Sequence, residues 1–485
     1  MNETAPENTC MKRMFVAGAV LLAFASLAHA DPKAWIAYQQ PVIALTHATI
    51  VDGTGAAPKL DQTLVIDKGR ISELGPTASI KVPTGAIVID AHGKTLLPGF
   101  VMMHEHLFYP TRLSPSAFYT AMPHSFPPLY LAGGETTIRT TGSMMPYADL
   151  NVRDDIAAGK RAGPDIDVTG PYLQGGSTYT EDMHVLTGPA DATRTVDYWA
   201  DEGVTSFKAY DHITRAELKA AIDAAHAHHD KITGHLCSVT FREAAELGID
   251  NLEHAFFVAS DFAKDKQPDQ CPGGHAVPQS IAGLDLDSPQ VDSLIKLLVD
   301  KHVALTSTLP VFASFIPGEP ETSDAALALL DPRLRDIYQE TWKKIHAVPK
   351  TRATQMQAWF AKSAALEKRF VEAGGLLMGG SDPTGYGGVI PGFSSKRELE
   401  LLVQADGFTF PRAIEILSLN AAKFGGREKD IGSLAVGKRA DIVVIDGDPV
   451  KDVAAVERMP LVFKDGVGYD TAAIFKSMQG QIGMN

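Results

Sequence analysis

The sequence predicts an α/β fold in which a (β/α)₈ TIM barrel carries a small β-sandwich domain, built from both ends of the chain after residue 30. Between residues 98 and 425, short apolar segments alternate with amphipathic helical stretches, which is typical of a barrel of parallel strands. Residues 31–97 and 426–485 instead contain short strands separated by turn dipeptides. We therefore expect the two end segments to form one domain beside the barrel.

Residues 1–30 are predicted to be a signal peptide. Lys12 and Arg13 precede an apolar run over residues 14–27, and Ala28-His29-Ala30 follows as a small-residue cleavage site. This run is shorter than the roughly twenty residues that a membrane-spanning helix needs. We expect cleavage after Ala30, a periplasmic or secreted protein, and no membrane attachment afterwards.

The two end segments share a hairpin pattern. In the first, Thr63–Asp67 leads into the turn dipeptide Lys68-Gly69, and in the second, Ala440–Ile445 leads into Asp446-Gly447. Since both ends have the same character, we expect their strands to assemble into one β-sandwich.

The barrel prediction depends on eight candidate strands that are apolar or β-branched and are mostly separated by helical stretches. These strands are Phe100–His104, Glu135–Thr140, Asp165–Thr169, Val204–Ala209, Lys231–His235, Gly248–His254, Val303–Thr308 and Gly375–Ser381. Two linkers, 257–287 and 309–350, are too long for plain loops, so we expect insertions or lids at the barrel rim.

Residues that bind metals stand at the ends of these strands. His104 and His106 close the first strand, and residues two apart on a strand point the same way. Such a pair is a weak signal by itself. Four further candidates end later strands: Lys208, His235, His254 and Asp382. Because the carboxyl ends of barrel strands surround one opening, we expect all six side chains to meet there.

The chemistry of these six side chains is coherent. Neutral imidazoles and a carboxylate are good ligands for Zn²⁺ or a similar divalent ion. The cationic amine of Lys208 would be repelled by metal ions unless CO₂ converts it to a carbamate, which can bridge two ions. Asp382 can then contact a metal and also accept a proton from the attacking water.

The ordered motifs resemble those of the amidohydrolase superfamily, and the resemblance covers essentially the whole chain after residue 30. It is carried by residues 97–106, Gly234-His235, Glu253-His254 and Ser381-Asp382, and by the ending over 418–422 and 431–444. Within the superfamily, the chain is most similar to the secreted prolidase, ochratoxinase and imidazolonepropionase-like branch.

The resemblance implies a binuclear centre with two Zn²⁺ ions. His104 and His106 together with Asp382 would hold one ion, His235 and His254 would hold the other, and carboxylated Lys208 would bridge them.

Two departures from the superfamily's patterns bear on function. Relatives often have an Asp shortly after the second-strand Arg, whereas Arg139 is followed by Thr140-Thr141, which puts that contact in doubt. Many mononuclear deaminases have a Glu three residues after the third His, but here His235 is followed by Leu236-Cys237-Ser238. The missing Glu, together with Lys208, favours a binuclear hydrolase over a deaminase.

Three residues are weaker candidates for substrate contact. Tyr210 lies two residues beyond Lys208 and could polarise a carbonyl or hold a carboxylate, although packing at the barrel rim is an equal alternative. Arg139 could bind a carboxylate bidentately or pair with an internal acid. His184 could line the pocket or belong to a surface loop.

We therefore expect a hydrolase that cleaves an amide or peptide C–N bond in a dipeptide or N-acyl amino acid. A lactone or organophosphate ester hydrolase is the alternative, and a deaminase or cyclic-amide hydrolase is less favoured. A binding protein without activity would be expected to lose ligands, and none of the six is missing.

Composition limits the partners of the chain. With 58 acidic and 44 basic residues the net charge is −14, which disfavours nucleic acid and anionic membranes and leaves a small-molecule substrate. A homo-oligomer is compatible with the sequence. Cys237 and Cys271 could pair in an oxidising compartment, but two cysteines alone do not establish a disulfide.

Overall fold

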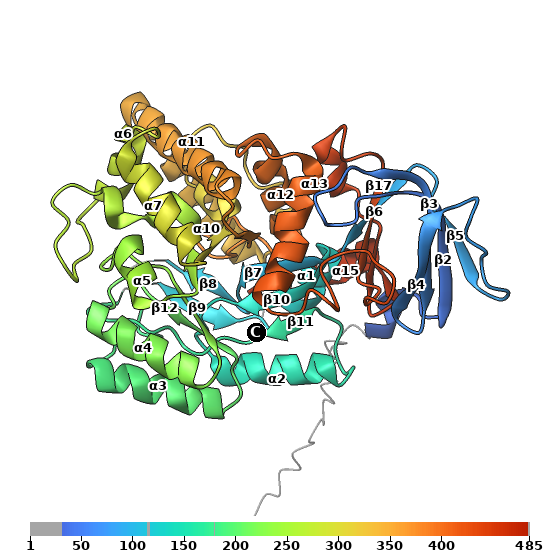
Figure 1. Ribbon diagram of the computed structural model, residues 1–485, viewed down its shortest axis with the longest axis horizontal. Helices are drawn as coiled ribbons and strands as arrows, with labels where there is room; N and C mark the ends of the chain where they lie inside the picture. The colour runs from blue at the N-terminus through green and yellow to red at the C-terminus, as the bar shows by residue number, and fades with distance from the viewer. Residues whose placement is uncertain (1–31, 114–116, 179, 484–485) are drawn as a thin grey trace, which may run out of the picture. The chain divides into compact units, whose positions relative to one another are not determined.

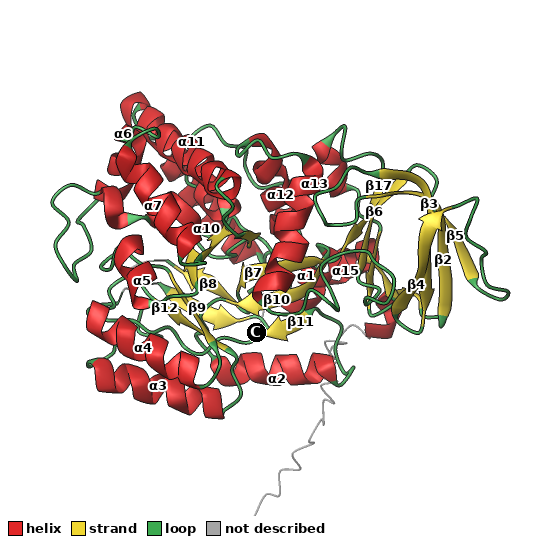
Figure 2. Ribbon diagram, in the orientation of Figure 1, coloured by secondary structure: helices red, strands yellow, loops and turns green. Residues whose placement is uncertain are grey.

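The computed structural model describes residues 32–113, 117–178 and 180–483 (Figures 1 and 2). The signal peptide predicted over residues 1–30 lies outside this part of the chain and stays a prediction. Among the described residues, every helix is too short or too polar to cross a bilayer.

The two end segments combine in one mixed β-sheet. Its strands are β1 (Ile36–Tyr38), β2 (Val42–Ile50), β3 (Lys59–Asp67), β4 (Arg70–Pro76), β5 (Ile87–Asp90), β6 (Lys94–Pro98), β17 (Ile442–Asp446), β18 (Leu461–Lys464) and β19 (Val467–Asp470). Their order is β1-β19-β18-β17-β6-β2-β3-β4, with β5 paired to β2. The junction is the antiparallel pair β6–β17, in which Pro98 lies opposite Ile442 (Figure 1).

The prediction that strands from both ends of the chain assemble together is therefore confirmed, but the predicted sandwich needs correction. The described end strands form one sheet instead of two stacked layers. The physical reason is that β6 and β17 pair edge to edge, so the C-terminal strands extend the N-terminal ladder.

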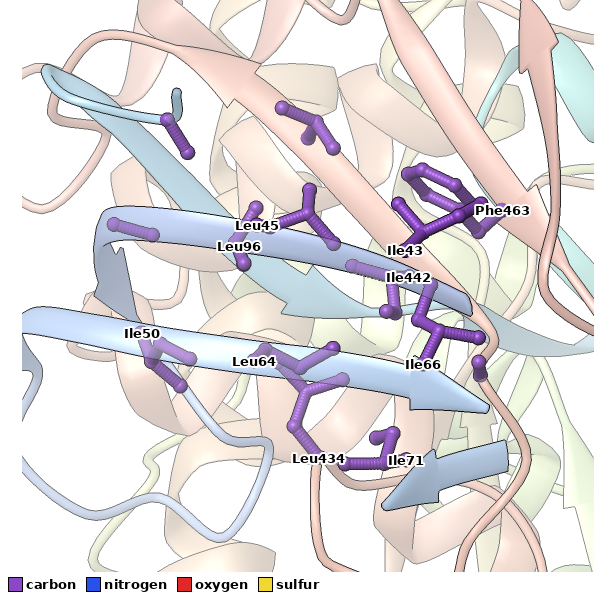
Figure 3. Packing of buried hydrophobic residues seen from close by; sticks show 14 of the residues in the cluster. Ile43, Leu45, Ile50, Leu64, Ile66, Ile71, Leu96, Leu434, Ile442 and Phe463 are labelled. Carbon is purple, nitrogen blue, oxygen red and sulfur yellow. The ribbon is translucent and has the colours of Figure 1, made fainter. Parts of the chain in front are cut away.

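The core of this sheet is apolar and draws on both ends of the chain. Ile43 and Leu45 of β2 pack with Leu96 of β6, and Ile442 of β17 and Phe463 of β18 belong to the same buried cluster (Figure 3). Burial of these side chains, at about 25 cal/mol per Å² of apolar surface, ties the two segments together.

The predicted barrel strands are all present as parallel strands. They are β7 (Phe100–Glu105), β10 (Glu135–Thr140), β11 (Asp165–Asp167), β12 (Ser206–Ala209), β13 (Lys231–Gly234), β14 (Asn251–Glu253), β15 (Ala304–Ser307) and β16 (Leu377–Gly379). They form two sheets, ordered β11-β10-β7 and β12-β13-β14-β15-β16. The predicted closed barrel is thus interrupted between the two sheets.

Isolated contacts join the two sheets at both interruptions. Thr169 and Ser206 form one parallel bridge between the β11 and β12 sides. On the other side, the carbonyl of His104 accepts hydrogen bonds from the backbone N–H groups of Ser381 (3.2 Å) and Asp382 (3.0 Å). Gly380 permits this approach because a Cβ at that position would collide with the Cβ of His104. The chain after β16 is thereby held beside the end of β7.

Helices surround these strands (Figure 2). They are α1 (Phe126–Ala132), α2 (Pro146–Ala157), α3 (Pro189–Asp201), α4 (Arg215–Ala227), α5 (Phe241–Leu247), α6 (Ala276–Gly283), α7 (Pro289–Asp300), α8 (Leu309–Ala313), α9 (Asp324–Leu327), α10 (Pro332–His346), α11 (Lys350–Glu372), α12 (Ser394–Gln404), α13 (Phe410–Glu415), α14 (Ala421–Phe424) and α15 (Thr471–Ser477). Reciprocal capping boxes start two of them, with Thr214 and Glu217 at α4 and Thr240 and Glu243 at α5.

The long linkers contain local structure. Helix α6 lies in 257–287, and helices α8, α9 and α10 lie in 309–350. A disulfide between Cys237 and Cys271, whose Cα atoms are 4.9 Å apart, ties the first linker to the segment after β13. The sequence did not predict the hairpin of β8 (Phe108–Arg112) and β9 (Phe118–Ala121), which follows the first barrel strand.

Candidate active site

The structure brings the six predicted metal ligands together at the carboxyl ends of the barrel strands. His104 lies in β7 and Lys208 in β12, while the others follow β7, β13, β14 and β16 within three residues. All are buried except His235, which is half-buried. The set comprises His104, His106, Lys208, His235, His254 and Asp382.

Short distances connect the members of this cluster. Nε2 of His104 lies 3.2 Å from Nζ of Lys208, and Nε2 of His106 lies 3.2 Å from Oδ1 of Asp382. Nδ1 of His235 lies 3.0 Å from Nε2 of His254. In addition, His104, His254 and Asp382 each offer one possible metal-ligand atom, and these three atoms lie within 4.8 Å of one another. Imidazole nitrogens and a carboxylate at this spacing fit a divalent cation.

Two of the cluster residues have a left-handed backbone conformation. His254 has a φ of 65° and Asp382 has a φ of 50°. This region costs about 1–3 kcal/mol for residues other than glycine, and it persists where the surroundings impose it. Both side chains line the cavity described below, so the strained backbone accompanies the placement of functional groups.

Other buried residues orient the cluster. Oε2 of Glu253 lies 2.8 Å from Nδ1 of His104, and Arg139 donates to its Oε1 at 3.1 Å. Because an ionised carboxylate only accepts, Nδ1 of His104 carries the proton and Nε2 is left with its lone pair. Oγ1 of Thr308 lies 2.8 Å from Nδ1 of His254. Such outer contacts fix ring orientation and ligand basicity.

Glu105 holds the segment that carries Asp382. Its carboxylate accepts hydrogen bonds from the backbone N–H of Ser381 at 2.7 Å and from the Ser381 hydroxyl at 2.6 Å. Glu105 thus holds the Asp382 segment in place from the face of the strand opposite to the one that carries His104 and His106.

Sequence reasoning missed the roles of Glu253, Thr308 and Glu105. Each stands next to a ligand or at the end of a predicted strand, which was the available signal. Their partners come from distant strands and could not be read from that position alone.

Burial and neighbouring charge tune the protonation of the cluster. Burial and the charge of Lys208 lower the pKa of His104 to about 4, and the same causes lower the pKa of His235 to about 4. Both imidazoles are therefore neutral near pH 7, which is the form that binds metal. Burial lowers the pKa of Lys208 to about 8. Burial alone would raise the pKa of Asp382, but His104 and His106 hold it well below its usual value.

The cluster opens into a cavity of about 230 Å³. Its floor includes His106, Lys208, His235, His254 and Asp382. Its walls are largely aromatic and consist of Phe108, Tyr119, Tyr172, Tyr210, Phe312 and Phe315. A small molecule can therefore reach the predicted ligands through an apolar enclosure.

The three predicted substrate contacts lie in different places. Tyr210 lines the cavity, with its ring centroid 5.0 Å from that of His235. Arg139 does not line it, because its guanidinium is buried among the barrel strands and donates to Ser206, Thr233 and Glu253. The internal acid pairing is the alternative that this arrangement supports.

His184 also lies outside the cavity lining. Its side chain is 53% exposed, and its Nε2 lies 3.0 Å from Oδ2 of Asp191, a residue of α3. Asp191 also accepts from the backbone and the hydroxyl of Thr187, so the contact belongs to the start of that helix. This placement fits the surface-loop alternative for His184.

Comparison with known sequences finds relatives over part of the chain. A profile of the Amidohydrolase family matches residues 363–476. The dihydroorotase of Mycobacterium tuberculosis is 35% identical over 92 residues, which are 19% of this chain and 20% of that protein. The chain thus matches about a fifth of the length of its curated relatives.

Comparison with solved structures extends the likeness to nearly the whole fold. A candidate prolidase from Bifidobacterium longum has a TM-score of 0.64 and 23% identity, covering 90% of this chain and 98% of that chain. A Xaa-Pro dipeptidase has a TM-score of 0.65 and 18% identity, covering 88% of this chain and 100% of that chain. At these identities the structures establish a common fold. Together with the family match over residues 363–476, they make the chain similar to Amidohydrolase family proteins in part of its sequence and in nearly its whole fold.

Proposed function

We propose that the chain is a metal-dependent hydrolase that cleaves an amide or peptide C–N bond. The observation that carries this proposal is the convergence of four imidazoles, a carboxylate and a buried lysine in one cluster, of which all but His104 line one cavity. Such a donor set fits divalent ions, and the cavity gives a substrate access to it.

The proposed centre holds two ions, with Zn²⁺ as the expected metal. His104, His106 and Asp382 would bind one ion, and His235 and His254 would bind the other. Carboxylated Lys208 would bridge them. This assignment is supported by the position of Lys208, whose Nζ is adjacent to His104 and forms no ion pair with any residue that the structure describes. When bound, two divalent ions lower the pKa of water and polarise a substrate oxygen.

The chain's own residues would carry the proton and hold the substrate. In the net reaction, water adds its oxygen to the carbonyl carbon, the C–N bond breaks, and the nitrogen leaves as an amine. Asp382 would accept the proton from the attacking water and return it to the leaving nitrogen. Its Oδ1 accepts a hydrogen bond from Thr384 at 2.7 Å, which restrains the carboxylate. Tyr210 would contact the substrate from the cavity wall.

The substrate is proposed to be a small amide, and the dipeptide or N-acyl amino acid type is the class that the sequence predicts. The names of the structural neighbours, a candidate prolidase and a Xaa-Pro dipeptidase, support peptide-like amides. We further propose that the protein acts in the periplasm or outside the cell, which the predicted signal peptide and the Cys237–Cys271 disulfide both favour.

Metal content and amide hydrolysis, measured together, test the proposal. We expect about two ions per chain in the parent protein, and a large loss of both metal and turnover in Lys208→Ala and His235→Ala. His226→Ala is the matched control, because His226 pairs with Asp250 at the end of α4 and should not affect metal binding.

Two outcomes would count against the proposal. One tightly bound ion with full activity after Lys208→Ala would overturn the binuclear centre. Turnover of lactones or organophosphate esters without any amide cleavage would favour the ester hydrolase alternative.

A further inference from the structure

The cavity differs in charge from a site built for carboxylate-bearing substrates. Among the described residues that line it, Lys208 is the only lysine or arginine. Nζ of Lys208 sits 3.2 Å from Nε2 of His104, within the ligand cluster. The guanidinium of Arg139 does not line the cavity and already donates hydrogen bonds to Glu253, Ser206 and Thr233. A free carboxylate on the substrate would therefore enter an apolar enclosure without a guanidinium or ammonium partner of its own.

One wall of the cavity is a rigid aromatic surface around Phe312. The Phe312 ring stacks on Phe257 at 4.3 Å with an interplanar angle of 10°, and it meets Trp359 edge-on at 5.5 Å. The indole nitrogen of Trp359 donates to the backbone carbonyl of Phe257 at 3.2 Å. Phe312 also meets the ring of His254 edge-on at 5.4 Å. This wall is thus preorganised beside the ligand cluster.

A second part of the cavity lining is aromatic as well. Phe108 stacks on His106 at 4.4 Å and meets Tyr119 edge-on at 5.3 Å. Tyr172 and Tyr210 meet edge-on at 4.8 Å. These rings come from the β8–β9 hairpin and from the segments after β11 and β12, so they present a second preformed apolar face.

The volume limits the size of what the cavity accepts. At about 230 Å³ it is smaller than pockets for drug-sized ligands, which are roughly 300–1,000 Å³. A single aromatic or branched apolar group beside the scissile amide matches this space better than an extended peptide.

We propose that the preferred substrates are compact amides with an uncharged aromatic group and no free carboxylate, and that Phe312 and the other aromatic rings of the lining select them. This inference rests on the proposed amide hydrolysis and replaces the dipeptide or N-acyl amino acid class at the same site, because both of those substrate types carry a free carboxylate. It separates this chain from dipeptidases, whose substrates carry a carboxylate beside the amide.

The test uses two amides that differ only in the carboxylate: N-acetylphenethylamine and N-acetyl-L-phenylalanine. With the Zn²⁺-saturated protein, we expect kcat/KM to be at least about tenfold higher for N-acetylphenethylamine than for N-acetyl-L-phenylalanine. The reason is that N-acetyl-L-phenylalanine must bury a carboxylate that has no cationic side chain as a partner. Phe312→Ala should lower kcat/KM for the uncharged amide by about tenfold, because one aromatic wall is lost.

A charge-introducing variant sharpens the test. Met144 lines the cavity and is half-buried, so Met144→Arg would offer a guanidinium to the carboxylate. We expect this variant to reduce the preference to about threefold or less, or to reverse it. Met145→Arg is the matched control, because Met145 is also half-buried but does not line the cavity. It should keep the parent preference.

Each result separates the inference from the proposed function. Equal rates, or a preference of the parent protein for N-acetyl-L-phenylalanine, would overturn the inference and leave amide hydrolysis standing. If neither amide were hydrolysed, the proposed function would be in question. Calorimetric titration of both amides into the Asp382→Asn protein would then decide the inference, with tighter binding of the uncharged amide supporting it and tighter or equal binding of the carboxylate overturning it.

Discussion

Glu253 and His104 form a fully buried carboxylate–imidazole pair, with Oε2 and Nδ1 separated by 2.8 Å across two strands that are 149 residues apart in sequence. Arg139 donates to the other oxygen of Glu253, so a buried chain of hydrogen bonds connects its guanidinium to His104, a predicted metal ligand. These hydrogen bonds explain why Arg139 faces the barrel interior.

Replacing Glu253 by Gln should weaken metal binding by about 10–100-fold. The Gln side chain has one acceptor oxygen and one NH₂ group, so its two terminal atoms cannot accept from His104 and Arg139 at the same time. His104 therefore loses its fixed tautomer and part of its basicity. Competition with a metal chelator measures the affinity. Glu246→Gln on the exposed face of α5 is the control and should bind metal like the parent. Unchanged affinity in Glu253→Gln would show that the pair does not position the ligand.

Thr308→Val should weaken metal binding and turnover, whereas Thr308→Ser should keep both near the parent values. The valine keeps the shape of threonine but removes the hydroxyl that lies 2.8 Å from Nδ1 of His254. Loss of a contact to a buried polar group costs about 1–3 kcal/mol, so we expect an effect of about tenfold or more on metal affinity. Parallel metal titrations of the two variants check this. Equal losses in both would indicate a packing effect.

The contribution of Glu367, Glu398 and Asp406 to the free energy of unfolding should fall as the pH rises from about 4.5 to about 8. Glu367, Glu398 and Asp406 are buried together, and within the described part of the chain no salt bridge involves any of them. Burial raises the pKa of Glu367 from its ordinary 4.5 to about 8, and burial also raises the pKa values of Glu398 and Asp406. The folded state therefore keeps protons that the unfolded chain releases in this range, and stability is lost as they dissociate.

Urea unfolding at several pH values measures this dependence. Glu367→Gln should reduce the slope between pH 4.5 and 8, since its amide cannot titrate, while Glu372→Gln at the exposed end of the same helix should not. A steeper loss in Glu367→Gln than in the parent would contradict the assignment.

Removal of the disulfide should destabilise the protein by about 2–4 kcal/mol, because the bond closes a loop between residues 34 positions apart. The double variant Cys237→Ala, Cys271→Ala can be compared with the parent in urea with and without a reductant. The reductant should lower the stability of the parent and leave the double variant unchanged. A parent protein that is insensitive to reductant would show that the bond does not contribute.

Much of the site could be predicted because strand periodicity and strand ends are local properties of the sequence. Residues two apart on a strand share a face, which placed His104 and His106 together, and parallel strands end at one opening, which collected His235 and His254. The partners of buried polar groups are not local. Arg139 could have faced a substrate or an internal acid, and only the position of Glu253 on another strand decided between them.

The sequence alone determined the eight barrel strands, the assembly of strands from both chain ends, and the group of side chains at the strand ends, because each follows from periodicity or spacing along the chain. Only the tertiary structure decided that the end strands form one sheet, that Glu253, Thr308 and Glu105 orient the cluster, and that aromatic rings from the β8–β9 hairpin and α8 enclose it. These features depend on contacts between distant segments, whose free energy comes from packing in three dimensions and leaves little trace in the local pattern of residues.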